Sequence, residues 1–187
     1  AAFARVLLNG GDKIGFILFN HKFIKISFPE NSKNTFDIFC NELSNVENYG
    51  DYGNIKKVLE ALLEILNSSI SLLILVSDFI QVDESCRELF EKIGAIVETV
   101  AIIVKDPLDE SMPDLNKEII IQNPNTGEKL IINPILAKKS YENYSKDHDF
   151  LLNKIFEESD IDFLKLMTFE EFSFPLASFL KNRAERR

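Results

Sequence analysis

The stretch "LLILVSDFI" (Leu72 to Ile80) decides the fold of this chain. Its first five residues are all apolar, which is typical of a strand buried on both faces of a sheet. Ser77 and Asp78 then interrupt the run at the point where the chain must turn. The sequence therefore predicts a strand covered by helices on each side that ends beside an aspartate, at the edge where open α/β sheets collect their ligands.

Helices and strands alternate on both sides of this segment. An amphipathic helix begins near Ile55, and another is expected from Glu84 to Ile93, stopped by Gly94. The apolar strand "AIVETVAIIV" then runs to Val104. This order predicts an α/β fold with a doubly wound, mostly parallel, Rossmann-like sheet and helices on both faces. We expect a single domain over residues 1–187.

Two antiparallel hairpins are predicted in addition. The first joins "KIGFILFN" to "HKFIKISF" at Asn20-His21, and its second strand is expected at a sheet edge. The second is an added hairpin over residues 118–132, with Gly127 available for positive φ. Further helices are expected over 1–9 and 32–46 and from Pro134, and "DFLKLMT" is expected as a last strand. Thr168 to Glu171 fits a capping box before the final helix.

Charge and composition exclude several classes of partner. The 30 acidic residues outnumber the 21 basic ones and give a net charge of −9, which does not favour nucleic acid or a membrane contact from this segment. No apolar run reaches the roughly 18 residues of a membrane span. Cys40 and Cys86 lie at apolar helical positions and are expected as small buried hydrophobes. A cytoplasmic location is compatible with this cysteine usage.

Asp78 allows two interpretations, and the sequence leaves both open. It is either a turn or cap residue after the strand, or a metal ligand. A divalent cation such as Mg²⁺ prefers about six oxygen ligands, so one carboxylate needs companions. The fold would bring the "GDYGN" loop beside it, although such loops are more often plain solvated turns. The candidate metal ligands are therefore Asp78, Asp51, Ser77 and Asn54, with Mg²⁺ or another divalent cation as the cofactor.

Other polar features are interpreted as structural. The acidic cluster from Asp106 to Asp114 is expected to be a solvated loop between Pro107 and Pro113. His21 and His148 accompany no nucleophile motif, and we expect both at surface or half-buried positions. The glycines of "NGGDKIG" precede a strand, so they do not form a phosphate-binding loop. We expect no catalytic residue in this chain.

The ordered set of motifs resembles a known family. "GDKIGFILFN", the "YGN" loop, "LLILVSDF", "KDPLDESMP", "NPNTGEKLIIN", a tyrosine-bearing helix and "FLKNRAERR" together are similar to the von Willebrand factor A-like domain of uncharacterised prokaryotic proteins encoded beside MoxR-type AAA+ ATPases. The resemblance covers essentially the whole chain. It implies a protein-interaction or adaptor domain that works with a MoxR-type ATPase.

The resemblance also implies a metal-ion-dependent adhesion site that is degenerate here. Asp78 matches its third element, whereas Gly53 stands where a threonine of the second would be, unless Asp51 substitutes from a shifted register. The first element, Asp-x-Ser-x-Ser after the first central strand, is absent from these residues. The resemblance therefore implies weakened metal binding and a further strand before Ala1. We expect residues 13–20 and 71–77 not to pair directly with each other.

A different class of function also fits an aspartate at a strand end. A receiver-like or magnesium-dependent phosphotransfer domain would use Asp78 as the phosphoacceptor and Lys105 as the lysine at a neighbouring strand end. Such domains need an acidic pair after their first strand, and the hairpin at 118–132 has no place in them. This interpretation is therefore the alternative.

Overall fold

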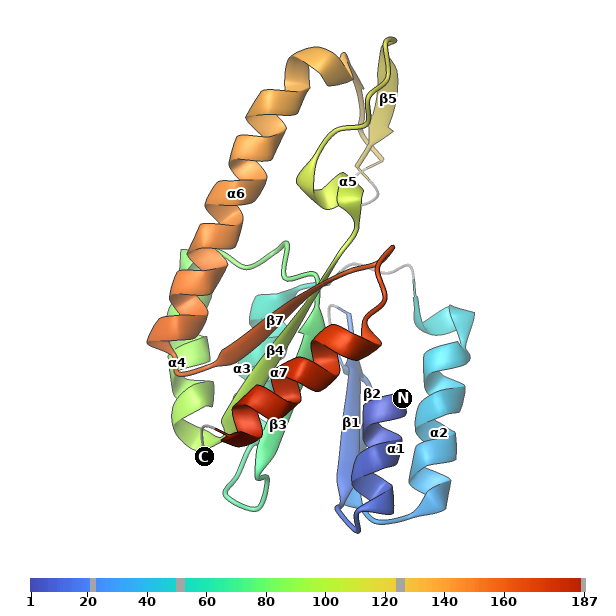
Figure 1. Cartoon of the computed structure of the whole chain (residues 1–187), viewed down its shortest axis with the longest axis vertical. Coiled ribbons are helices and arrows are strands. Elements are labelled where there is room, and N and C mark those ends of the chain that lie inside the picture. Colours follow the sequence, from blue (N-terminus) through green and yellow to red (C-terminus); the bar gives the residue numbers. More distant parts are fainter. Residues whose placement is uncertain (21–22, 50–52, 124–126, 186–187) are drawn as a thin grey trace. The chain divides into compact units, whose positions relative to one another are not determined.

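The structure is a computed structural model that describes residues 1–20, 23–49, 53–123 and 127–185. The chain divides into two compact units, Ala1–Ala61 and Leu62–Arg187, which are described separately. Both units are drawn in Figure 1. The fold is mixed α/β, as predicted, with a parallel sheet, antiparallel strands and helices. The single domain over residues 1–187 stays a prediction.

The first unit is built around an antiparallel strand pair. Its elements in chain order are α1 (Ala2–Asn9), β1 (Ile14–Phe19), β2 (Phe23–Glu30), α2 (Lys33–Ser44), the 3-10 helix η1 (Val46–Asn48) and the beginning of α3 (Ile55–Ile65). The predicted hairpin is confirmed, with Ile17 opposite Ile26, and His21 lies outside the described residues. Phe16 of β1 packs on Phe39 of α2, with ring centroids 5.0 Å apart.

The second unit is built around a parallel sheet of three strands. Its strands are β3 (Leu72–Ser77), β4 (Glu98–Lys105) and β7 (Asp162–Met167), in the order β3-β4-β7. The register aligns Leu75 with Ala101 and Ala101 with Phe163. In the described part of the chain, β1 pairs with β2 and β3 pairs with β4, as expected. A strand before Ala1 stays a prediction.

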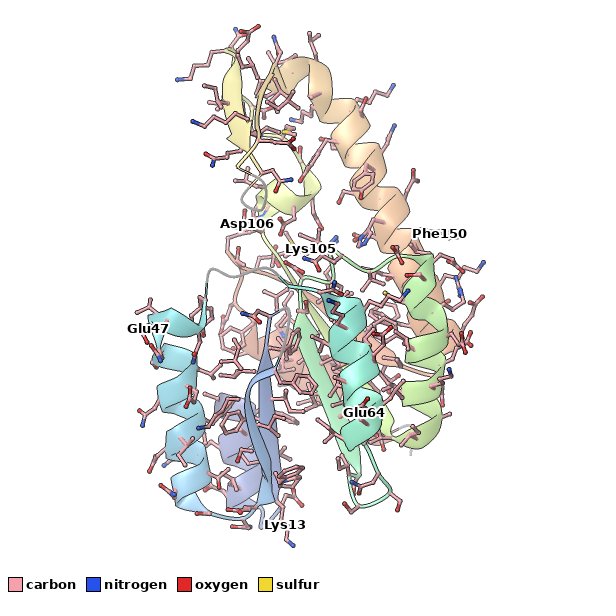
Figure 2. The ribbon with its side chains drawn as sticks, turned by 180° about the vertical axis from the view of Figure 1, so that it is seen from behind. Lys13, Glu47, Glu64, Lys105, Asp106 and Phe150 are labelled. Atoms are coloured by element: carbon pink, nitrogen blue, oxygen red, sulfur yellow. The ribbon has the colours of Figure 1, made fainter. Side chains whose placement is uncertain are left out.

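The helices of the second unit are the 3-10 helix η2 (Glu84–Cys86), α4 (Arg87–Ile96), α5 (Pro107–Glu110), α6 (Pro134–Glu158) and α7 (Ser173–Glu185). Of these, α4 contacts β4, and α6 and α7 contact β7. The helix α7 crosses in front of β4 and β7 in Figure 1, whereas α4 comes to the front in the reverse view of Figure 2. The predicted hairpin is formed by β5 (Ile119–Gln122) and β6 (Lys129–Ile132), with Gly127 at a φ of 72°.

Three phenylalanines form the centre of the core of the second unit. Phe79 follows β3, Phe90 lies on α4 and Phe156 lies on α6, and all three are fully buried. The ring centroid of Phe156 lies 5.4 Å from that of Phe79 and 5.2 Å from that of Phe90, both edge to face. This geometry is favourable for aromatic pairs. The cluster therefore ties the loop after β3 to both helices.

Gly94 does not stop its helix, contrary to the prediction. The helix α4 continues through Gly94 to Ile96, so the strand that was expected from Ala95 begins only at Glu98. A Cβ atom at position 94 would collide with the backbone carbonyl oxygen of Ser159. The glycine is therefore required by the close approach of the segment after α6, and not by a helix end.

Candidate functional site

The carboxyl ends of the three parallel strands define the candidate site. Because the strands are parallel, β3 ends at Ser77, β4 at Lys105 and β7 at Met167 on the same edge of the sheet. Figure 2 labels Lys105 and Asp106 where the chain leaves β4. Loops after parallel strands are the usual place for ligands in such folds. We call this region the carboxyl edge.

Asp78 lies exposed at this edge in a tightly held turn. Its Oδ1 accepts a hydrogen bond from the amide of Ile80 at 3.1 Å, and Ser77 Oγ accepts one from the amide of Phe79 at 3.2 Å. Phe79 has a φ of 54°, which is unusual for a bulky residue, and its ring is 1% exposed. Burial of this ring therefore holds a strained turn that presents Asp78 to solvent.

The turn role of Asp78 is thus directly visible, and of its predicted companions Ser77 lies beside it, since Ser77 Oγ donates to Asp78 Oδ1 at 3.4 Å. Asn54 belongs to the first unit, where its Oδ1 accepts from the amide of Lys57 at 3.1 Å at the beginning of α3. Asp51 lies outside the described residues. Among the residues that the structure describes, no three His, Cys, Asp or Glu side chains are grouped to hold a metal ion. The metal site at Asp78 therefore stays a prediction.

Asp106 organises the loop after β4. Its Oδ1 accepts from the amide of Leu108 at 3.0 Å, and its own amide donates to Asp109 Oδ2 at 2.8 Å. These two bonds form a capping box at the beginning of α5, with Pro107 in the first turn. The loop was expected to be solvated throughout, but part of it is this capped helical turn.

The same carboxylate also binds Thr168, which corrects another prediction. Thr168 Oγ1 donates to Asp106 Oδ2 at 2.9 Å, and the Thr168 amide donates to the Lys105 carbonyl at 2.9 Å. The predicted capping box from Thr168 to Glu171 is therefore wrong, because α7 begins only at Ser173. Thr168 instead links the ends of β7 and β4.

Lys105 carries a buried charge at this edge. Its side chain is 2% exposed, and its ammonium group forms an ion pair with Asp149 of α6. Asp149 also pairs with Lys165 of β7 at 2.8 Å, and Lys165 pairs with Glu110. The four side chains form a charge network, which we call the Lys105 network. Because its lysine is already paired, this geometry gives the phosphotransfer alternative no support.

Two of these groups have shifted pKa values. Burial opposes ionisation of Asp149, but hydrogen bonds from Lys105 and Lys165 outweigh it and lower the pKa of the carboxyl group. Burial likewise disfavours the charged form of Lys165, but hydrogen bonds to Asp149 and Glu110 raise the pKa of its ammonium group. Both shifts favour the ionised forms of Asp149 and Lys165. No local sequence pattern indicates Asp149 and Lys165, because only the fold brings them to Lys105.

The segment from Asp106 to Asp114 packs on α6 through several polar contacts. Tyr141 Oη donates to the Leu108 carbonyl at 2.9 Å, and Ser145 Oγ donates to the Asp109 carbonyl at 3.1 Å. Burial, together with the nearby carboxylate of Asp109, raises the pKa of the Tyr141 hydroxyl. The expectation of a solvated loop therefore holds for the exposed residues 106–108 and Asp114, whereas residues 109–113 are half-buried.

The predicted positions of the remaining reactive side chains are partly confirmed. His148 is half-buried, with Nε2 at 3.0 Å from the Val82 carbonyl oxygen. It lines an open pocket of about 420 Å³ between the loop after β3 and α6, together with Ile80, Gln81, Val82, Asp83, Tyr144, Asp147 and Leu151.

Cys86 is buried, as expected, whereas Cys40 is half-buried, and both are free thiols. Within the described ranges, no helix is long and apolar enough to cross a membrane.

Comparisons with known proteins place the chain in a family. No curated protein matches it. A conserved hypothetical protein, BatB from Bacteroides thetaiotaomicron, is similar with a TM-score of 0.59 and 10% identity over 98% of this chain and 86% of that one. An aerotolerance-related membrane protein from Bacteroides fragilis, crystallised with multiple mutations to serine, is similar with a TM-score of 0.56 and 10% identity over 96% of this chain and 82% of that one.

At this level of identity, these two likenesses show the fold alone. The family is shown by the sequence itself, since residues 1–149 match the family described as "Protein of unknown function DUF58". The match covers the elements from α1 to β6 and ends inside α6. This chain therefore belongs to the DUF58 family.

Proposed function

We propose that this chain is a non-enzymatic protein-interaction or adaptor domain of the von Willebrand factor A type, which works with a MoxR-type AAA+ ATPase. Asp78 at the carboxyl edge is the residue that contacts the partner, and metal binding at this edge is weakened or lost. The observation that carries the proposal is the turn at Asp78. An exposed carboxylate there is held by a strained, buried neighbour, Phe79, and such strain gathers at functional sites.

The surroundings of Asp78 support a binding role over a catalytic one. Lys105, Asp106 and Thr168 lie at the same edge, but hydrogen bonds and ion pairs engage them with one another or with α6. Asp78, in contrast, bonds to the described part of the chain through Oδ1, which accepts from Ser77 Oγ and from the Ile80 amide. An exposed carboxylate at the end of a strand fits recognition of a basic or polar group on a protein partner.

The proposal is tested by measuring binding of a purified MoxR-type ATPase from the same organism. The chain, Asp78→Ala and the control Asp114→Ala are compared by biolayer interferometry in Mg²⁺ and in EDTA. We expect Asp78→Ala to weaken binding about tenfold or more, which corresponds to about 1.4 kcal/mol. Asp114 lies on the exposed end of the loop after β4, and we expect its variant to bind like the wild type.

Two outcomes contradict the proposal in different ways. Equal binding by the wild type and Asp78→Ala removes Asp78 from the interface. Absence of binding by the wild type removes this class of partner. The EDTA arm separately tests metal dependence, and calorimetric titration of Mg²⁺ into the wild type and Asp78→Ala measures any contribution of this carboxylate to ion binding.

A further inference from the structure

The open pocket between α6 and the loop after β3 has a volume of about 420 Å³, which is within the range of ligand-binding pockets. Four residues of α6 line it, at positions i, i+3, i+4 and i+7, and therefore share one face of the helix: Tyr144, Asp147, His148 and Leu151. The opposite wall is the segment from Ile80 to Asp83. We call this cavity the α6 pocket.

Several groups that line the α6 pocket are aliphatic. Val82 is 1% exposed and Ile80 is 46% exposed, and Leu151 is half-buried on α6. His148 joins the two walls, since its Nε2 lies 3.0 Å from the Val82 carbonyl oxygen. An aliphatic chain that packs between these walls removes apolar surface from water.

The charge in the α6 pocket is negative. Besides His148, the lining groups that are charged at neutral pH are the carboxylates of Asp83 and Asp147. Asp83 Oδ1 accepts a hydrogen bond from the amide of Ser85 at 2.8 Å, which orients this carboxylate at the beginning of η2. In the described part of the chain, no lysine or arginine lines the pocket. A cationic group is therefore complementary to it.

The pairing of an aromatic ring with a carboxylate favours arginine as the source of that cation. Tyr144 is 66% exposed and lies one turn before Asp147 on the same face of α6. A guanidinium group stacks on an aromatic ring and also forms two parallel hydrogen bonds with a carboxylate, whereas an ammonium group is a compact point charge. The ring and the carboxylate together therefore fit a planar cation.

We propose that the α6 pocket binds an arginine side chain from a basic peptide segment. The guanidinium group lies against Tyr144 and pairs with Asp147, and the aliphatic stem packs on the apolar groups of the walls. This inference deepens the proposed function and rests on it only for the origin of the peptide, which is a segment of the protein partner.

NMR titration of the intact chain with N-acetylarginine amide as the probe tests the inference. We expect saturable shifts of the amide signals of residues 80–83 and 144–151, with a dissociation constant on the order of 1 to 10 mM. N-acetylcitrulline amide has nearly the same shape but no charge, and we expect it to bind about threefold more weakly or less tightly still.

Two variants with matched controls locate the binding groups. We expect Asp147→Asn to weaken binding of the arginine probe about threefold or more, whereas Asp114→Asn, at an 86% exposed carboxylate outside the pocket, binds like the wild type. We expect Tyr144→Leu to weaken binding to a similar degree. Its control, Phe150→Leu, removes another exposed ring of α6 that does not line the pocket.

Three results overturn the inference. One is a wild type whose pocket signals show no saturable shift up to about 50 mM probe, and this arm depends on no variant. Another is equal affinity for the arginine and citrulline probes. The third is equal weakening by Asp147→Asn and its control. Because the probe replaces the ATPase and Asp78 is unchanged in every variant, failure here leaves the proposed contact of Asp78 with the ATPase standing, and the reverse holds as well.

Discussion

The ammonium group of Lys105, buried at the carboxyl end of β4, forms an ion pair with the carboxylate of Asp149 on α6. Both charges are taken out of water, and the lysine is almost fully so. Desolvation of a buried charge is costly, and a paired neighbour offsets that cost. Removing one partner alone should therefore lower the free energy of unfolding more than replacing both partners with apolar residues.

This asymmetry gives the first prediction. We expect Asp149→Ala to lower the free energy of unfolding by about 3–5 kcal/mol, because it leaves Lys105 buried without its main counter-charge. The double variant Lys105→Met/Asp149→Leu should recover most of that loss. Urea unfolding followed by circular dichroism measures both. The control Asp114→Ala removes a carboxylate that is 86% exposed and pairs with Lys138, and should cost less than about 1 kcal/mol.

A cost for Asp149→Ala no larger than that for Asp114→Ala would contradict the buried-pair explanation. A double variant less stable than Asp149→Ala alone would contradict it as well. Both variants lack Asp149, so Lys165 loses this partner in each of them and keeps Glu110, and the lost contribution cancels when the single and double variants are compared.

The pH dependence of stability tests the same pair in a second way. The pKa of Asp149 in the folded chain lies below its ordinary value of 3.8. A lowered folded pKa stabilises the fold at pH values above the unfolded pKa, and the contribution is lost as the pH falls through the folded pKa. We expect the stability difference between the wild type and Asp149→Asn to be constant from about pH 5 to 7 and to shrink below about pH 4.

Urea midpoints measured at intervals from pH 3 to pH 7 provide this comparison. A difference that grows on acidification would have the wrong sign. A difference that does not change at all would mean that Asp149 titrates alike in the folded and unfolded chains.

Gly94 supplies a prediction about packing. The Cβ atom of Gly94→Ala would meet the carbonyl oxygen of Ser159, which is backbone and cannot swing away. We expect a loss of about 1–3 kcal/mol from this overpacking, although alanine has the better helix propensity. The neighbouring control Ala95→Ser also adds one heavy atom, at an exposed position, and should stay within about 0.5 kcal/mol. Thermal unfolding of both variants decides whether the glycine is required for the close approach.

Gly94 also illustrates what the sequence can and cannot predict. The alternation of apolar strands and amphipathic helices is local, so it predicted β3, α3 and the parallel arrangement of the second unit correctly. A glycine near a helix end reads as a stop signal, and nothing local reveals that Ser159 will lie against it. Local pattern similarly placed a capping box at Thr168, whereas the side chain binds Asp106, a residue 62 positions away.

The candidate site likewise contains residues that a local sequence pattern indicates and residues that only long-range packing brings together. Asp78 was found because it follows an apolar strand, which is a local signal. Lys105 was also visible at a strand end, but its partner Asp149 lies 44 residues away on a helix of mixed polarity. Burial of the lysine is set by how α6 packs, and the sequence does not give that packing directly. Long-range polar pairs are therefore the part of the site that pattern analysis could not predict.

Arg183 anchors α7 to the amino-terminal ends of the sheet strands. Its side chain is 11% exposed and pairs with Glu98 of β4 and, at 3.0 Å, with Asp162 of β7. We expect Arg183→Ala to destabilise the fold by about 1–3 kcal/mol and to increase amide exchange in α7. The control Lys181→Ala removes an exposed lysine from the same helix, and we expect no measurable change. Equal exchange in both variants would contradict the anchoring role.

Two effects of Phe79 on stability can be separated by substitution. Burial of its ring stabilises the fold, whereas its positive φ destabilises it. Phe79→Ala should cost about 3–5 kcal/mol through loss of the buried ring, whereas Ile80→Ala, at a 46% exposed position, should cost less than about 1 kcal/mol. At the φ of 54°, alanine keeps the strain but glycine does not. We therefore expect Phe79→Gly to be more stable than Phe79→Ala by about 1 kcal/mol, the reverse of the usual order. Urea unfolding of the two variants measures this difference, and an alanine variant more stable than the glycine variant would contradict the left-handed turn that presents Asp78.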